Sequence, residues 1–114
     1  MAPRYDILSV YPMLGKGRGR LSPHKIRMAM AVRGKNRHYR WNEISARHWL
    51  ETARRCGISE MKSIMDEVIA QTPRVVDQAT ARLPRKFPDQ IAATILSGTA
   101  AAARLLGEQL AKLR

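Results

Sequence analysis

The second half of this chain is dominated by apolar residues that recur every three or four positions. Between residues 61 and 83 the recurrence is almost unbroken, and its members are Met61, Ile64, Met65, Val68, Ile69, Thr72, Val75, Val76, Ala79 and Leu83. Side chains at this spacing share one face of an α-helix, so the pattern predicts a long amphipathic helix. Pro73 lies inside the pattern. We expect it to kink or split the helix, because its ring removes one backbone hydrogen bond.

A second long helix is predicted to open near Pro88 and Asp89. Its apolar face comprises Ile91, Ala92, Ile95, Leu96, Thr99, Ala102, Ala103, Leu106, Leu110 and Leu113. The small residues at 100–103 would let a neighbouring helix approach closely. Because a short link at 84–88 joins the two long helices, we expect an antiparallel pair. Apolar stripes at this spacing indicate a packed core rather than a cofactor site.

A shorter helix is predicted ahead of this pair. Its apolar face would carry Ile44, Trp49, Leu50, Ala53 and Cys56. Gly57 is placed to end it, since glycine adopts the left-handed conformation common just after a helix. Ser59 is the expected N-cap of the following helix, where Glu60 would lie in the favourable field of the helix N-terminus.

The segment 25–41 is predicted to form a β-hairpin. Its apolar residues alternate with other residues in the two-residue period of a half-buried strand, at Ile26, Met28, Met30 and Val32. The Gly-Lys-Asn sequence at 34–36 suits a turn. Residues 38–41 would form the second strand, with an aromatic ring at every other position. A helix over 25–33 is the alternative, because Met and Ala favour helices.

Residues 1–24 show no sustained period, and the glycine-rich run at 15–20 predicts a surface loop. The composition of this run is similar to that of a phosphate-binding loop. Such a loop, however, needs a strand before it and a helix N-terminus after it, so that backbone N–H groups converge on the phosphate. Here a Leu-Ser-Pro turn at 21–23 follows instead.

Positive charge is concentrated in the first half of the chain. Residues 1–55 carry 13 Lys and Arg against three acids, whereas residues 56–114 carry eight against six. This asymmetry predicts a surface that meets an anion, with nucleic acid, a nucleotide or an acidic protein as the alternatives. The helix that carries Arg47, Arg54 and Arg55 is the predicted phosphate-contacting element, although Glu51 partly neutralises it. A solvated helix face is the alternative interpretation.

Length and composition indicate one domain in the cytoplasm. The chain has 114 residues, 45% of them hydrophobic, which is enough for a single packed core. No apolar run approaches the ~20 residues that span a bilayer, and no signal peptide is recognisable. Cys56 is the single cysteine, which excludes an internal disulfide. The three histidines, His24, His38 and His48, are scattered along the sequence, so no zinc cluster is expected.

Four runs of this sequence are similar to a known family. They are APRYDILSVYP, LSPHKIRMAMAVRGKNRHYRW, RHWLETARRCGI and LPRKFPDQIAATILSG. In order and spacing they resemble the C-terminal part of HipA-family serine/threonine kinases, the toxins of HipA–HipB toxin–antitoxin modules. The resemblance implies the mostly helical C-terminal lobe of a protein-kinase-like fold over residues 1–114. Within it, 1–24 would be an irregular segment with a metal-binding aspartate and a basic loop, 25–41 the hairpin, and 42–114 helical.

The same resemblance implies one metal ligand. Asp6, in Tyr-Asp-Ile-Leu-Ser, matches the family aspartate that holds the catalytic Mg²⁺, an ion that prefers oxygen ligands and bridges phosphate oxygens. The family's phosphate loop, its nucleotide-anchoring lysine and its catalytic aspartate all precede this point. We therefore expect no catalytic residue and no kinase activity in this chain alone. Mg²⁺ and ATP are the cofactors of the intact family, and none is expected for the isolated chain.

The resemblance also implies partners for this chain. An internal start, a shortened gene and a split kinase all fit, and the last implies a separate N-terminal kinase half. A HipB-like antitoxin is the other expected partner, with DNA reached through that complex and no membrane contact. The split-kinase interpretation predicts exposed apolar surface on residues 1–14 and 26–41. The alternative function is a small basic helical module that binds antitoxin or nucleic acid.

Overall fold

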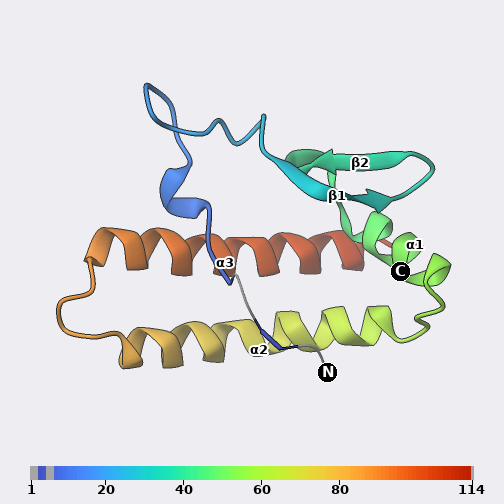
Figure 1. Ribbon diagram of the computed structural model, residues 1–114. Helices are drawn as coiled ribbons and strands as arrows, with labels where there is room; N and C mark the ends of the chain where they lie inside the picture. The colour runs from blue at the N-terminus through green and yellow to red at the C-terminus, as the bar shows by residue number, and fades with distance from the viewer. Residues whose placement is uncertain (1–2, 5–6, 114) are drawn as a thin grey trace.

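The computed structural model describes residues 3–4 and 7–113 of the chain. Within them the fold is mostly helical, with a two-stranded antiparallel hairpin near the N-terminus. The elements are two 3-10 helices, η1 (Tyr11–Met13) and η2 (Trp41–Glu43), two strands, β1 (Arg27–Arg33) and β2 (Arg37–Arg40), and three α-helices, α1 (Ala46–Arg55), α2 (Met61–Arg82) and α3 (Asp89–Ala111). Figure 1 shows the hairpin and η1 on one side of α3, and α2 on the other.

The two long helices form the predicted antiparallel pair (Figure 1). Pro73 lies inside α2 without splitting it, because α2 is continuous from Met61 to Arg82. The predicted N-cap at Ser59 is wrong by one residue, since Glu60 is the N-cap of α2. The Ser59 side chain instead hydrogen-bonds Glu60, which is the main reason that the pKa of this carboxyl is lowered.

Helix α1 begins after Ser45 and ends where the sequence predicts. Gly57 has a φ of +74°, the left-handed conformation that closes the helix, and the Ile58 N–H donates to Ala53 O at 2.9 Å. At the other end, the Ala46 N–H donates to Gln109 Oε1 of α3 at 2.9 Å. This bond ties the start of α1 to the end of α3.

The hairpin is present, but its inward alternation fails at one position. Arg27 pairs with Arg40 and Val32 with His38, and the register shifts between these two pairs. Met30 lies in the shifted stretch and is 79% exposed, although the sequence predicts that it faces inward with Val32. A register shift of this kind turns side chains away from the face that strict alternation would give them.

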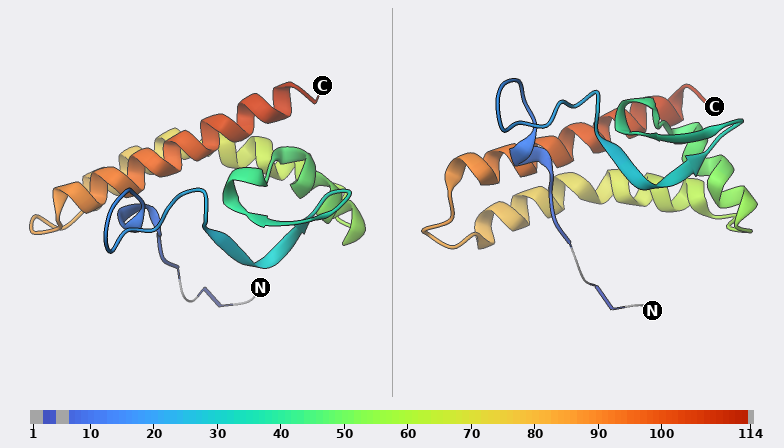
Figure 2. Two further views of the ribbon diagram at one scale, coloured as in Figure 1. Left: turned by 90° about the horizontal axis from the view of Figure 1, so that it is seen from above. Right: turned by 45° about the horizontal axis from the view of Figure 1, so that its top comes forward.

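Two contacts hold the N-terminal part of the chain on the helices. The Arg33 N–H donates to Thr52 Oγ1 at 2.7 Å, which joins β1 to α1. The Tyr11 ring of η1 lies directly on the backbone of α3 at Gly98, where an added Cβ would lie 2.7 Å from ring carbons. Tyr11 also meets the Trp41 ring edge-on, with centroids 6.3 Å apart. On the N-terminal side of η1, residues 7–10 extend away from the helix pair (Figure 2).

The core is small and lies where α1 meets α2 and α3. Its buried members are Ala46, Met65 and Leu110, and the residues packed against them are Trp49, Leu50, Met61, Ile69 and Leu106. The accessible surface is 9440 Å², whereas a compact monomer of this mass exposes about 6300 Å². The radius of gyration is 15.7 Å, against about 13 Å for a compact domain of this length. The chain is therefore less compact than a typical monomer, and large apolar side chains such as Leu8 and Met30 remain exposed.

Among the residues that the structure describes, no helix combines the length and the apolar character required to cross a membrane.

Candidate docking surface and basic hollow

The predicted magnesium ligand, Asp6, lies outside the described residues. Ile7 and Leu8 follow it directly in the sequence, and they are 75% and 91% exposed. Within the described part of the chain, no three His, Cys, Asp or Glu side chains gather closely enough to hold a metal ion. The predicted role of Asp6 thus stays a prediction.

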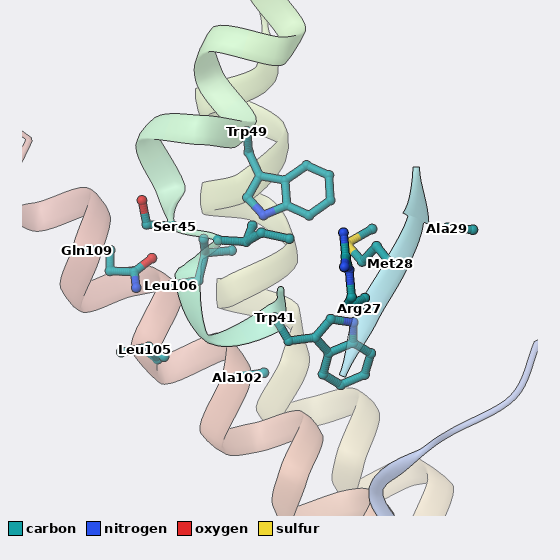
Figure 3. A pocket seen from close by; sticks show the side chains of 11 residues that line it. Arg27, Met28, Ala29, Trp41, Ser45, Trp49, Ala102, Leu105, Leu106 and Gln109 are labelled. Atoms are coloured by element: carbon teal, nitrogen blue, oxygen red, sulfur yellow. The ribbon is translucent and has the colours of Figure 1, made fainter. Parts of the chain in front are cut away.

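An apolar hollow of about 630 Å³ opens between the hairpin, the start of α1 and the C-terminal half of α3. Its lining consists of Arg27, Met28, Ala29, Trp41, Ile44, Ser45, Trp49, Ala102, Leu105, Leu106 and Gln109. Figure 3 shows the indole rings of Trp41 and Trp49 near β1, whereas Leu105 and Ala102 approach from α3. Such a concave apolar lining with few polar groups suits burial of another apolar surface.

Exposed apolar side chains occur in both segments where the sequence predicts them. In residues 7–14 they are Ile7, Leu8 and Met13, and in residues 26–41 they are Met30 and Trp41. Leu105, which lines the apolar hollow, is also exposed. We use the name docking surface for this hollow together with Ile7, Leu8, Met13, Met30 and Trp41.

The three arginines predicted to contact phosphates, Arg47, Arg54 and Arg55, differ in their hydrogen-bond partners. Arg54 Nε and Arg55 Nε donate to the Glu51 carboxylate at 2.8 and 2.6 Å. These hydrogen bonds, the one from Arg54 first, lower the pKa of Glu51 to about 2. Arg47 lies two turns earlier on α1, and its Nε–H is directed at His48 Nε2, 3.2 Å away. Arg47 and Arg55 line the same hollow, and Arg54 is outside that lining.

This basic hollow, of about 600 Å³, lies between the hairpin turn and α1. Its lining consists of Gly34, Lys35, Asn36, His38, Arg47, His48, Glu51 and Arg55. Arg55 also donates to the Gly34 carbonyl at 3.3 Å, so the turn and the helix are joined across the hollow. Three cationic side chains therefore surround one carboxylate that is already paired.

Two histidines that are ten residues apart in sequence stack in this hollow. The rings of His38 and His48 are nearly parallel, with centroids 3.9 Å apart. Gly34 permits this arrangement, because a Cβ there would lie 2.7 Å from His48 Cδ2 and 3.2 Å from His38 Nε2. The sequence interpretation treated these histidines as scattered and so missed the pair. Gly34 was the one sequence feature that could have indicated a close approach of side chains, but a glycine is equally expected in an ordinary hairpin turn.

His48 is 4% exposed, and its hydrogen bonds constrain its protonation. The Ser45 N–H donates to His48 Nδ1 at 3.2 Å, which completes a capping box at the start of α1. Burial, followed by the charges of His38 and Arg47, lowers the pKa of His48. Burial thus favours the neutral ring, which has one acceptor nitrogen. Two donors compete for that role, the Ser45 N–H at Nδ1 and the Arg47 Nε–H at Nε2.

No family model matches this chain. The resemblance to HipA-family kinases thus depends on the four sequence runs alone.

Proposed function

We propose that this chain is the C-terminal helical lobe of a HipA-like serine/threonine kinase of a toxin–antitoxin module. The lobe would act only when packed against a catalytic lobe. That catalytic lobe belongs either to a preceding segment of a longer chain or to a separate partner chain.

The observation that carries this proposal is the uncovered apolar surface. The chain exposes about 3000 Å² more than a compact monomer of its size would. A stable protein–protein interface buries roughly 1200–2000 Å² in total, so the excess is large enough for one. The exposed part includes the docking surface. Its exposed side chains Ile7, Leu8, Met13, Met30 and Trp41 come from the two segments that the split-kinase interpretation places against the missing lobe.

Two exposed side chains of the docking surface, Ile7 and Leu8, directly follow Asp6 in the sequence, which supports a catalytic occupant. Leu8 is 91% exposed and only two residues from Asp6. A lobe that covers Ile7 and Leu8 would bring its nucleotide site close to the Asp6 carboxylate. Asp6 could then help to hold Mg²⁺, which supplies charge neutralisation on the transferring phosphate. One carboxylate binds Mg²⁺ weakly, and phosphoryl transfer needs several positioned groups. The remaining groups would come from the catalytic lobe.

The first test identifies the natural context of the chain. An antibody against residues 88–114 would be used to blot the source cells, and the captured proteins would be identified by mass spectrometry. A larger band whose sequence includes a nucleotide-anchoring lysine and a catalytic aspartate supports a single-chain kinase. A 12.9 kDa band that captures such a chain supports a split kinase. A 12.9 kDa band with neither contradicts the proposal.

The second test measures phosphate transfer from labelled ATP. The chain alone should show none, and the assembled kinase should lose activity at least a hundredfold on Asp6→Ala, because the metal loses a ligand. Asp77→Ala, on the exposed side of α2, is the matched control and should leave activity unchanged. Transfer by the chain alone that disappears in Asp6→Ala would contradict the need for a second lobe.

A small basic module that binds nucleic acid or antitoxin is the second candidate. The hairpin and α1 together carry eight cationic side chains, Arg27, Arg33, Lys35, Arg37, Arg40, Arg47, Arg54 and Arg55. Affinity that rests on phosphate contacts falls steeply with added salt. Duplex DNA binding that weakens at least a hundredfold between 50 and 200 mM salt would favour this candidate. Binding that is insensitive to salt, or absent at low salt, would remove the nucleic-acid form of it.

A further inference from the structure

We propose that the basic hollow between the hairpin turn and α1 is a binding site for a phosphate-type oxyanion. The ligand class is inorganic phosphate or a terminal phosphate monoester. Arg47 Nε–H and His48 Nε2–H would hold it from inside, and Lys35 and Arg55 from the rim. This site is separate from the docking surface and does not depend on the kinase proposal.

Arg47 and His48 each present a hydrogen-bond donor to the hollow, and an anion could accept from both. His48 Nδ1 already accepts the Ser45 N–H, so the neutral ring carries its proton on Nε2. Arg47 Nε, which always carries a proton, lies 3.2 Å from that same Nε2. Two donors therefore face each other across a hydrogen-bond distance, and neither can accept from the other. A phosphate oxygen that accepts from both N–H groups would remove this conflict.

The alternative tautomer does not resolve the conflict. A proton on Nδ1 would let Nε2 accept from Arg47, but Nδ1–H would then face the Ser45 backbone N–H at 3.2 Å. That tautomer keeps the bond from Arg47 and adds a weak one to Ser45 Oγ, 3.5 Å away, but the Ser45 backbone N–H loses its acceptor. One donor is left without a ring acceptor in either tautomer. The Arg47 side chain is exposed and can turn to another acceptor, whereas the Ser45 N–H is fixed at the start of α1. The capping box selects the tautomer that directs the free donor into the hollow.

The charges around the hollow also favour an anion. Lys35, Arg47 and Arg55 line it, and Glu51 is the one acid in that lining. Arg54 donates a second, flanking pair of hydrogen bonds to Glu51, at 2.8 and 2.9 Å. The carboxylate is consequently occupied from both sides, and Lys35 and Arg47 keep their charge for a ligand.

The shape of the hollow favours a terminal phosphate over a nucleic-acid backbone. His48 is 4% exposed, so its donor lies at depth and not on an open face. A phosphate monoester presents three oxygens at the end of a ligand and can enter such a recess. Phosphodiesters of a duplex follow the outside of a helix and meet flat basic surfaces instead. The volume of about 600 Å³ is within the range of small-ligand pockets.

The test is a titration of the full-length, isotope-labelled chain with sodium phosphate, followed by NMR at constant ionic strength with chloride as the balancing anion. We expect saturable shifts of the His48 ring and of the Gly34 and Lys35 amides. The His48 ring nitrogens should show Nε2 protonated and Nδ1 unprotonated in the bound state. Absence of saturation, or shifts that chloride reproduces, would overturn the proposal.

Matched variants separate a built site from general electrostatics. Arg47→Gln should weaken phosphate binding about tenfold or more, because it removes a charge-assisted hydrogen bond. Arg104→Gln makes the same change of charge on α3, where Arg104 pairs with Glu108 at 4.0 Å. It should change the affinity less than twofold. Equal weakening in both variants would overturn the proposal.

The source of the phosphate is distinguished by parallel titrations. Tighter binding of O-phosphoserine than of inorganic phosphate would indicate a phosphorylated side chain, and tighter binding of a nucleoside monophosphate would indicate a nucleotide. Either result supports the site. Binding of a duplex oligonucleotide alone, with no response to any monoester, would mean that the hollow is only part of a general basic surface and would overturn the proposal.

Discussion

The Glu51 carboxylate accepts hydrogen bonds from two arginines, and the stability that these bonds give to α1 depends on pH. The pKa of Glu51 falls from its ordinary value of 4.5 to about 2 because Arg54 and then Arg55 donate to the charged form. A folded-state pKa below the unfolded one stabilises the native state above about pH 4.5. That contribution is lost as the pH falls through 2.

We therefore expect Glu51→Gln to lower the free energy of unfolding at pH 6, with the difference from the natural chain shrinking toward zero near pH 2. Urea unfolding followed by circular dichroism at the two pH values measures this. Glu108→Gln is the control, since its partner Arg104 lies 4.0 Å away and both side chains are exposed. A difference for Glu51→Gln that is the same at both pH values would contradict the assignment.

At the scale of elements, the contact between η1 and α3 depends on the missing side chain of Gly98. The Tyr11 ring occupies the place of a Cβ, 2.7 Å from where that atom would lie. Gly98→Ala should favour α3 by about 1 kcal/mol through helix propensity, yet it must displace η1. Hydrogen exchange should therefore speed up in residues 9–14 while α3 stays protected.

Gly107→Ala is the matched control for this change. It is in the same helix, and its new Cβ would be 3.6 Å from Ile69 Cγ2, an ordinary van der Waals contact. It should strengthen α3 and leave the exchange of residues 9–14 unchanged. Equal exchange rates in the two variants would show that Tyr11 does not anchor the N-terminal segment.

The elements of this fold differ in how well the sequence predicts them. The two long helices follow from their period, because one apolar stripe is typical of an amphipathic helix. The stripe predicts burial less well, since Ile64, Val68 and Val75 of α2 are exposed. Pro73 does not split α2, which is continuous there, and Thr72, Pro73 and Val76 lie together with Ala100 and Ala103 of α3. The exposure of Met30 depends on a register shift in β1, which strict alternation cannot reveal.

The candidate sites were less predictable than the helices for a related reason. The arginines of α1 could be placed on one helix from spacing alone. The stacking of His38 on His48 depends on how the hairpin turn folds back over α1, which is a tertiary contact with no local signal. The hydrogen bond from Arg55 to Gly34 O arises from the same approach, whereas the pairing of Arg55 with Glu51 is local, since the two lie four residues apart on α1.

At the scale of the whole molecule, burial is confined to one end of the helix pair, and much of the apolar surface faces solvent. Leu110 is 2% exposed and belongs to the core, whereas Ile7 and Leu8 are 75% and 91% exposed. Residues that contribute to a chain's own stability lose contacts when they are truncated, but exposed residues lose none.

These exposures predict opposite results for two kinds of substitution. Ile7→Ser with Leu8→Ser should leave the thermal midpoint unchanged and reduce the binding of a hydrophobic fluorescent dye. Leu110→Ala should destabilise the chain by about 2–5 kcal/mol, because it opens a cavity in the core. If the Ile7 and Leu8 changes lowered the midpoint as much as Leu110→Ala does, these side chains would belong to the chain's own core. An unchanged midpoint would instead leave them available for another lobe, which is what a docking surface requires.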